Sequence, residues 1–226
     1  VAHVQNLINS GYSMKAIHEL CAGSSGHSQG LMTATFLSMG FEGDEFREAF
    51  RIYIRYLFKL GILCQMEYPV LQPMESDKRR SEQLNLGNPA PMAAILGENQ
   101  GILDQFIERF NSKRKIGARI YIGLVNHHTN QILSAPRSVL LDFYEETMED
   151  LKSQNLSFVF LHTSCPFHSP YMEGVKKSFV SVLKSLDFPY RGKHLRYPVY
   201  SFLDGRNLQG DDHFGETIFP EMTIQK

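Results

Sequence analysis

The sequence predicts an α/β protein that carries an inserted α+β subdomain, and two observations lead to this fold class. The first is Gly26-His27-Ser28-Gln29-Gly30, which fits the G-x-S-x-G pattern of a nucleophile elbow, a serine on a tight turn between a strand and a helix. The second is a strand-helix-strand-strand-helix-strand order within residues 89–164, which is the split βαβ order of a ferredoxin-like unit. We therefore expect a core made of residues 1–88 and 165–226, interrupted by a subdomain of residues 89–164.

The elbow pattern has a direct physical rationale. Gly26 and Gly30 lack the Cβ atoms that would clash where the backbone bends sharply. A helix from Leu31 onward would aim its N-terminal amides at the Ser28 oxygen, where an oxyanion would form. The alternative is a glycine-rich turn in a serine-rich loop, because Ser24 and Ser25 lie just upstream.

Several helices are predicted in the core. Apolar residues at helical spacing predict a helix over residues 1–9, and Ser13 is placed to cap a short helix that follows. A long amphipathic helix is predicted from Gly43 to Leu60, ended by Gly61. Its expected buried face is Phe46, Ala49, Phe50, Tyr53, Ile54 and Leu57. Residues 67–91 are rich in proline, serine and charge, which predicts a surface connection.

The subdomain elements follow from their apolar patterns. Strands are predicted over residues 92–96, 118–125, 131–135 and 158–162, with a turn at residues 126–130. Helices are predicted over residues 100–111 and 136–154. The second helix is expected to turn Val139, Leu140, Phe143, Met148 and Leu151 inward.

Composition narrows the classes of function. Lys and Arg number 23 against 24 Asp and Glu, so the near-neutral balance argues against a nucleic-acid partner. Three cysteines at unrelated spacings predict neither a disulfide framework nor a metal site, and they suit a reducing compartment. No apolar run is long enough to span a membrane, so we expect a soluble, cytoplasmic protein. The first residue is not Met, so we expect a piece of a longer protein.

A second candidate catalytic residue lies in the segment Cys165-Pro166-Phe167-His168-Ser169-Pro170. Here His168 occupies a loop bracketed by prolines, between a predicted strand and a predicted helix. A serine nucleophile needs a base, and a neutral imidazole is the usual one near pH 7. The alternative is that His168 only forms hydrogen bonds within its own loop.

Taken together, these motifs resemble the acyl-CoA:carrier-protein transacylase family. The closer resemblance is to the acetyltransferase domain, which loads the starter, of large type I, fungal-type fatty acid synthases. The matching segments, in order, are 26–34 (GHSQGLMTA), 88–92 (NPAPM), 124–136 (LVN…ILSAP), 165–172 (CPFHSPYM) and 198–205 (PVYSFLDG). The resemblance implies an α/β-hydrolase-like core, a ferredoxin-like subdomain, and a partial domain whose ends are missing.

The resemblance also implies a ping-pong acyl transfer. Ser28, activated by His168, would attack acyl-CoA, and the acyl-serine would then pass to the phosphopantetheine thiol of an acyl carrier protein. The backbone N–H of Gln29 would supply half of the oxyanion hole. The other half normally comes from a Gly/Gln-rich loop that this sequence does not contain. No cofactor is expected in the domain, and other domains of a multienzyme synthase are expected as partners.

Substrate choice is predicted from one position. Malonyl-transferring members carry an Arg just before the glycine of the long helix, where it pairs with the malonyl carboxylate. The matching residue here is Leu60, which suits an acetyl or short acyl group because an apolar side chain cannot compensate a buried carboxylate. Neighbouring Lys59 points about a hundred degrees away around the helix, and Arg55 lies more than a turn earlier.

Two further residues are carried over from the family pattern. Asn126 matches a residue near the site, although it could equally be a turn residue before His127. His27 precedes the nucleophile, and it either lines the cleft or packs beneath the elbow.

Other functions stay open at this point. A malonyl-CoA:carrier-protein transacylase is the first alternative to acetyl loading. A serine thioesterase or other hydrolase would use the same two residues but admit water. An inactive scaffold domain of a megasynthase would need neither Ser28 nor His168.

Overall fold

The computed structural model describes residues 2–98, 101–186 and 188–219, and the chain forms two compact units. Unit 1 comprises Val1–Ile62 and Lys177–Met222, and unit 2 comprises Leu63–Lys176 and Thr223–Lys226. Val1 and Gln100, which the sequence assigns to helices, lie outside the described residues.

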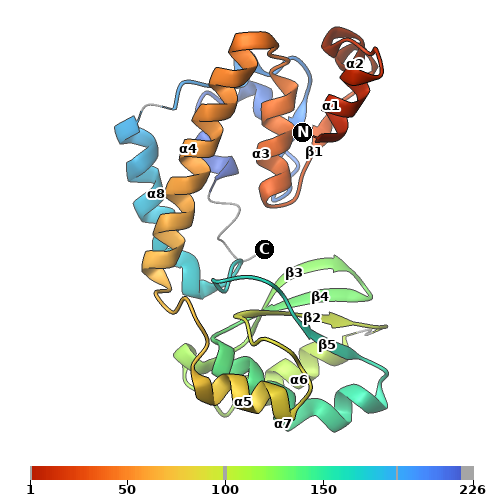
Figure 1. Ribbon diagram of the computed structural model, residues 1–226, viewed down its shortest axis with the longest axis vertical. Helices are drawn as coiled ribbons and strands as arrows, with labels where there is room; N and C mark the ends of the chain where they lie inside the picture. The colour runs from red at the N-terminus through yellow and green to blue at the C-terminus, as the bar shows by residue number, and fades with distance from the viewer. Residues whose placement is uncertain (1, 99–100, 187, 220–226) are drawn as a thin grey trace. The chain divides into compact units, whose positions relative to one another are not determined.

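Unit 1 begins with the elements predicted around the elbow (Figure 1). Helices α1 (Ala2–Asn9) and α2 (Met14–Leu20) come first, and the Ser13 side chain caps α2 by accepting a hydrogen bond from the Ala16 amide at 3.1 Å. Strand β1 (Ser24–Ser25) pairs in parallel with β6 (Val199–Tyr200). Helix α3 (Gln29–Ser38) follows β1, so the predicted strand-turn-helix is confirmed.

The long helix α4 (Gly43–Glu67) differs from its prediction in length and in buried face. It continues through Gly61, which was expected to end it. A glycine inside a helix costs about 0.5–1 kcal/mol relative to alanine, and burial of Leu60 and Cys64 on either side offsets this cost. The buried residues are Ala49, Tyr53, Tyr56, Leu60 and Cys64, whereas Phe50 and Ile54, expected inside, are 42% and 46% exposed.

Aromatic side chains pack around α4 in the core of unit 1. Tyr53 and Tyr56 contact Phe188 and Phe219, with ring centroids 5.0–6.1 Å apart. Phe188 follows helix α8 (Glu173–Leu186), and Phe219 follows α9 (Gly215–Ile218). Short 3₁₀ helices at Gly192–His194 and Leu208–Gly210 complete the described part of this unit. Packed aromatic pairs of this kind hold segments that are distant in sequence.

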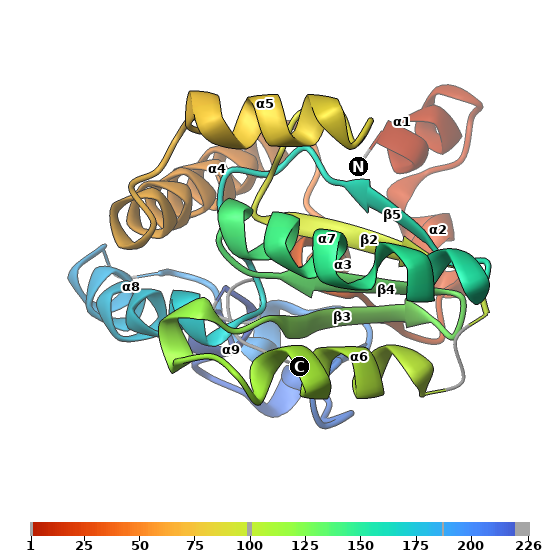
Figure 2. The ribbon, with the colours of Figure 1, turned by 90° about the horizontal axis from the view of Figure 1, so that it is seen from below.

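Unit 2 contains the predicted ferredoxin-like sheet. Strands β2 (Met92–Leu96), β3 (Tyr121–His127), β4 (Asn130–Ser134) and β5 (Ser157–Phe160) form an antiparallel sheet in the order β3-β4-β2-β5, with β2 and β4 in the middle (Figure 2). Helix α6 (Ile102–Asn111) joins β2 to β3, and α7 (Arg137–Ser153) joins β4 to β5. The βαββαβ order is therefore confirmed.

The two faces of this sheet are covered differently. Helices α6 and α7 cover one face, and their apolar residues pack against Ala93, Ile95 and Leu133. Side chains alternate along a strand, so Met92 and Ala94 point to the other face. There they are covered by apolar residues that include Leu161 and Phe167 from the segment after β5. The loop that carries His168 thus crosses the second face of the sheet.

Helix α5 (Glu75–Gln83) was not predicted, because residues 67–91 show no apolar periodicity. The helix is held by charge instead. The Arg80 guanidinium forms ion pairs with Asp142 and Glu145 of α7 at 2.7 and 2.8 Å. Ser81 is fully buried and donates a hydrogen bond to the Gly87 carbonyl at 2.7 Å.

Other details of unit 2 also differ from the sequence-based expectations. Strand β3 extends to His127, and the hairpin turn is only His128–Thr129, so Asn126 lies in the strand and the expected turn at 126–130 is wrong. Met148, expected inside α7, is 38% exposed, and Thr147 is buried in its place. Unit 2 also extends beyond residues 89–164, because it includes the end of α4, helix α5 and the His168 loop.

Candidate functional site

Ser28 sits at a strained turn between β1 and α3. Its φ and ψ angles are 55° and −123°, a combination that non-glycine residues rarely adopt. Two short hydrogen-bonded turns fix it, because the Gly30 amide donates to the His27 carbonyl at 2.9 Å and the Leu31 amide to the Ser28 carbonyl at 3.0 Å. Strain of this kind persists only where the surrounding structure imposes it, and it is concentrated at functional sites.

The two glycines of the motif have different roles. A Cβ atom on Gly26 would lie 2.1 Å from the Gly30 carbonyl carbon and 2.4 Å from the Leu31 nitrogen, both of which are backbone atoms. A Cβ atom on Gly30 would meet nothing within 4 Å. Gly26 is therefore required for the close approach of β1 to α3. At Gly30, by contrast, a Cβ atom would clash with none of the described residues.

The start of α3 provides amide donors beside Ser28. Because α3 begins at Gln29, the Gln29 N–H is among the first four helical amides, which have no acceptor within the helix. These amides and the positive end of the helix dipole favour negative charge. The oxyanion role of the Gln29 N–H stays a prediction.

His27 packs against an aromatic ring of its own unit. Its imidazole contacts the Phe202 ring edge-on, with centroids 4.5 Å apart, and the histidine is half-buried. Phe202 follows β6, the strand that pairs with β1. His27 therefore packs beside the elbow.

His168 lies in unit 2, in a loop that is tied to the sheet. The residue is 3% exposed and has a left-handed backbone with φ of 56°. The Ser134 hydroxyl of β4 donates a hydrogen bond to the Phe167 carbonyl at 2.7 Å. A Cβ atom on Gly123 of β3 would lie 3.2 Å from the carbonyl oxygens of both Phe167 and His168. The backbone of the loop therefore passes directly over β3 and β4.

Sequence reasoning missed Gly123 and Ser134, although one signal was available. An isolated glycine inside a strand indicates a bulge or a close approach of another backbone segment. Gly123 lies inside β3, at a register shift between Ile122 and Leu124. Nothing comparable pointed to Ser134, because a serine at a strand end is common.

The hydrogen bond from Ser134 should contribute measurably to stability. Ser134→Ala leaves the Phe167 carbonyl without this donor, so we expect the free energy of unfolding to fall by about 1–3 kcal/mol. Denaturant unfolding of the two proteins measures this difference. The control is Ser153→Ala on α7, which removes an exposed hydroxyl bonded to the Asp150 carbonyl and should change stability by no more than about 0.5 kcal/mol. Equal effects of both changes would contradict the anchoring role.

Cys165 can be set aside as a nucleophile. It lies three residues before His168, but it is buried, and burial raises the pKa of its thiol. Burial also raises the pKa of the Cys64 thiol to about 12, with a smaller contribution from Cys165. Neither thiol is ionised near pH 7, and the thiolate is the reactive form.

The remaining predicted residues have varied surroundings. Leu60 is 2% exposed on α4 in unit 1, whereas Lys59 and Arg55 are exposed, as the helical geometry predicts. Asn126 is exposed on β3 in unit 2. Ser28, Gln29, His27 and Leu60 thus belong to unit 1, and His168 and Asn126 to unit 2.

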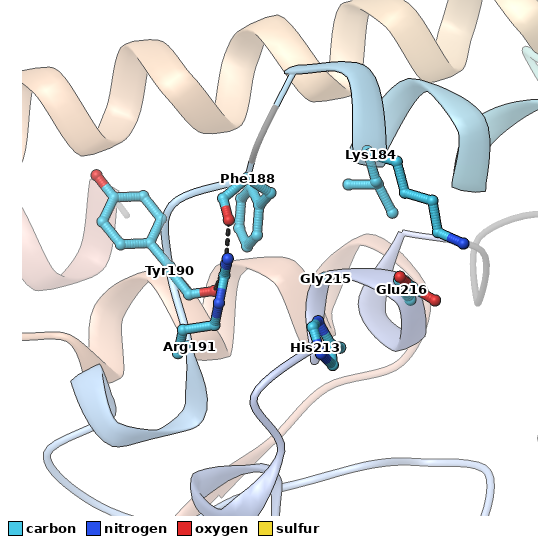
Figure 3. Close-up of a pocket in the computed structure, with 8 residues that line it drawn as sticks. Lys184, Phe188, Tyr190, Arg191, His213, Gly215 and Glu216 are labelled. Carbon is cyan, nitrogen blue, oxygen red and sulfur yellow. Dashed lines mark hydrogen bonds between the residues drawn. The ribbon is translucent and has the colours of Figure 1, made fainter.

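Unit 1 also contains a pocket of about 220 Å³ that is lined by other residues than those predicted for the site (Figure 3). It is lined by Leu183, Lys184, Phe188, Tyr190, Arg191, His213, Gly215 and Glu216. The Arg191 guanidinium donates to the backbone carbonyls of Phe188 and Tyr190. The pocket includes none of the residues predicted for the site.

Among the residues that the structure describes, no group of three or more His, Cys, Asp or Glu side chains is arranged to hold a metal ion. None of the described helices is both long and apolar enough to cross a membrane.

The strand-turn-helix at Ser28 and the ferredoxin-like sheet together define an α/β-hydrolase-like fold with a ferredoxin-like subdomain, which is also the fold of solved malonyl-CoA:acyl-carrier-protein transacylases. Residues 5–171 match the family described as "Starter unit:ACP transacylase in aflatoxin biosynthesis", and the chain belongs to this family.

Relatives and solved structures agree with this family. The chain is 26% identical over 213 residues to fatty acid synthase subunit beta of Saccharomyces cerevisiae, covering 88% of this chain and 10% of that protein. It is 28% identical over 199 residues to the Schizosaccharomyces pombe subunit beta, covering 82% and 9%. The chain therefore spans about a tenth of the length of these relatives.

Solved transacylases share the fold. An acyl-carrier-protein S-malonyltransferase from Bartonella henselae superposes with a TM-score of 0.63 at 16% identity, covering 97% of this chain and 58% of that one. A malonyl CoA-acyl carrier protein transacylase from Clostridium perfringens gives a TM-score of 0.62 at 17% identity, covering 98% and 57%.

Proposed function

We propose that this chain transfers an acetyl or short acyl starter from CoA to the phosphopantetheine thiol of an acyl carrier protein, as part of fatty acid or polyketide synthesis. The observation that carries the proposal is the strained Ser28 at the start of α3, in a chain that belongs to the transacylase family. A residue held in such a conformation costs about 1–3 kcal/mol. An inactive scaffold gains nothing from this strain.

In the first half-reaction, the Ser28 hydroxyl attacks the thioester carbonyl of acyl-CoA. Its proton passes to a ring nitrogen of His168, acting as general base. The carbonyl oxygen becomes an oxyanion, to which the Gln29 N–H donates a hydrogen bond. The carbon–sulfur bond then breaks, the CoA sulfur takes the proton from the imidazolium, and an acyl-Ser28 ester is left.

The second half-reaction reverses these steps with a different thiol. His168 accepts the proton of the phosphopantetheine thiol, whose sulfur attacks the acyl-Ser28 carbonyl. The ester bond breaks, Ser28 recovers its proton, and the carrier protein leaves with the acyl group. No step requires a bound metal or organic cofactor, so we propose that the domain uses none.

Acylation followed by mass spectrometry tests this proposal. The full-length protein that includes this chain is mixed with acetyl-CoA, and its mass is followed before and after addition of a carrier protein bearing phosphopantetheine. A transferase retains the acetyl group until the thiol is added, whereas a hydrolase releases CoA continuously without it. Absence of any acylation would remove the transfer proposal and favour the scaffold.

Malonyl transfer is the alternative, because similar solved structures include transacylases named for malonyl-CoA. The buried Leu60 favours acetyl, since an unpaired carboxylate beside an apolar side chain is strongly penalised.

Leu60→Arg should therefore change the preferred substrate. A guanidinium can pair with the malonyl carboxylate through charge-assisted hydrogen bonds, each worth about 1.5–3 kcal/mol. We expect the ratio of malonyl to acetyl acylation to rise by about 10-fold or more. Leu60→Met, which nearly conserves volume, is the control and should leave the ratio unchanged. A wild-type preference for malonyl-CoA would contradict the acetyl assignment.

A further inference from the structure

Helix α4 has a second apolar face, which the core of unit 1 does not cover. Phe50, Ile54, Phe58 and Ile62 recur at four residues, so they are neighbours along one ridge of the helix. Phe58 lies about 200° around the helix from Leu60, which belongs to the buried face. The four side chains are between 39% and 68% exposed. We call these four residues the outer row of α4.

A row of basic side chains lies beside the outer row. Arg51, Arg55 and Lys59 also recur at four residues, each one position after a member of the outer row, and all three are exposed. Arg51 forms an ion pair with Glu48 at 3.6 Å. Among the residues that the structure describes, Arg55 and Lys59 have no ion-pair partner. No Asp or Glu occurs from residue 49 to residue 66, so this face of α4 is both apolar and positively charged.

The outer row has the character of a contact surface. Contiguous exposed apolar patches generally mark protein–protein interaction sites, and covered aromatic side chains contribute strongly to interfaces. The sequence pattern also predicts that Phe50 and Ile54 are buried, whereas both are exposed in this chain. That prediction and the structure agree if another protein segment covers the outer row.

The positive charge restricts which segment can cover this face. In a symmetric antiparallel pair of helices, each flank meets the same flank of its partner. A second copy of the chain would therefore bring Arg51, Arg55 and Lys59 against the same three residues. A partner helix with Asp or Glu beside its own apolar row would place opposite charges there instead.

The shape of the face suits a helix. The outer row runs along α4 for about 18 Å, at 1.5 Å per residue, which is about three helical turns. Rows at four-residue spacing on two helices pack into each other in the commonest class of helix packing. A helix of about three turns can therefore cover the whole row.

We propose that an acidic amphipathic helix from a neighbouring domain of the full-length protein docks on the outer row of α4. The chain covers 10% of the Saccharomyces cerevisiae subunit beta and 9% of the Schizosaccharomyces pombe one, so these relatives contain much further sequence that could supply such a helix. Permanent interfaces are more apolar than transient ones. A row of Phe and Ile therefore fits a permanent neighbour better than a carrier protein, which has to leave after each transfer. This inference goes beyond the proposed function and stands if acyl transfer fails.

Photo-crosslinking in the full-length protein tests the proposal. Phe58 is replaced by p-benzoylphenylalanine, which keeps an aromatic ring at this exposed position, and crosslinked peptides are identified by mass spectrometry. We expect one predominant crosslink, within the same polypeptide, to a peptide outside residues 1–226. That peptide should have apolar residues at spacings of three and four, flanked by Asp or Glu. A mixture of isotopically labelled and unlabelled protein distinguishes crosslinks within one polypeptide from crosslinks between copies.

The same replacement at Met148 is the control, because Met148 is an exposed apolar residue on another helix, α7. It should not crosslink to the peptide that residue 58 reaches. A crosslink from residue 58 to another copy or to a carrier protein would overturn the proposal. A yield no higher than that from residue 148 would overturn it as well.

Charge reversal tests whether the docking segment is acidic. Arg55→Glu combined with Lys59→Glu changes two exposed side chains and sets like charges against an acidic helix. We expect the yield of the crosslink from residue 58 to fall by about tenfold, and by less at high salt. Arg55→Lys keeps the charge, and this variant should give the wild-type yield. An unchanged yield in the doubly reversed protein would refute an acidic partner.

Discussion

Ser28→Ala is expected to abolish formation of the acyl-enzyme. Ser28 is the attacking group of the proposed mechanism, and the Cys64 and Cys165 thiols are buried with raised pKa values. Removing the nucleophile of a serine enzyme lowers kcat by roughly 10⁶-fold, so the mass of the variant should not change in the presence of acyl-CoA. The release of CoA should fall to the uncatalysed rate.

Ser25→Ala is the matched control for this experiment. Ser25 lies three residues before Ser28, and its hydroxyl donates a hydrogen bond to the Tyr200 carbonyl at 3.0 Å, across the β1–β6 pair. The variant should therefore still be acylated at Ser28. Acylation of the Ser28→Ala protein at any other residue would overturn the assignment of the nucleophile.

Gly26→Ala is expected to have the largest effect on the elbow itself. The added methyl group would overlap the carbonyl carbon of Gly30 and the backbone nitrogen of Leu31. Neither of these two atoms can move without displacing the start of α3. Insertion of a methyl group into a well-packed site costs typically about 1–3 kcal/mol, and here the obstacle is backbone rather than a flexible side chain. Thermal and denaturant unfolding should show at least this loss, together with loss of acylation.

Gly30→Ala is the paired control, because a methyl group at residue 30 meets nothing within 4 Å. Residue 30 lies within α3, and alanine in a helix is more stable than glycine by about 0.5–1 kcal/mol. We therefore expect opposite signs for the two alanine variants. A destabilised Gly30→Ala protein would show that both glycines of the motif are needed for packing.

The sequence predicted best where a local pattern was sufficient. The apolar runs of β2, α6 and α7 identify elements whose side chains pack on one sheet, and the βαββαβ order follows from them. Helix α5 could not be predicted, because Arg80 is held by Asp142 and Glu145, more than sixty positions later. The predicted end of α4 at Gly61 was wrong, because burial of Leu60 and Cys64 outweighs the preference of glycine for helix ends.

The same distinction applies to the candidate site. The turn at Ser28 follows from the five contiguous residues of the motif, 26–30, and the strand-turn-helix predicted from them is confirmed. The support of His168 depends on Gly123 and Ser134, which come close to the loop only when the sheet has formed. Their importance is therefore a property of the tertiary structure, and no spacing in the sequence reveals it.

The backbone of Ser28 implies a trade-off between stability and activity. With φ of 55° and ψ of −123°, this position suits glycine better than any residue with a side chain. A chain selected only to resist unfolding would carry glycine there and would have no hydroxyl. Serine at residue 28 therefore lowers the local stability of the fold. The tight packing of Gly26 against α3 holds the serine in this strained conformation.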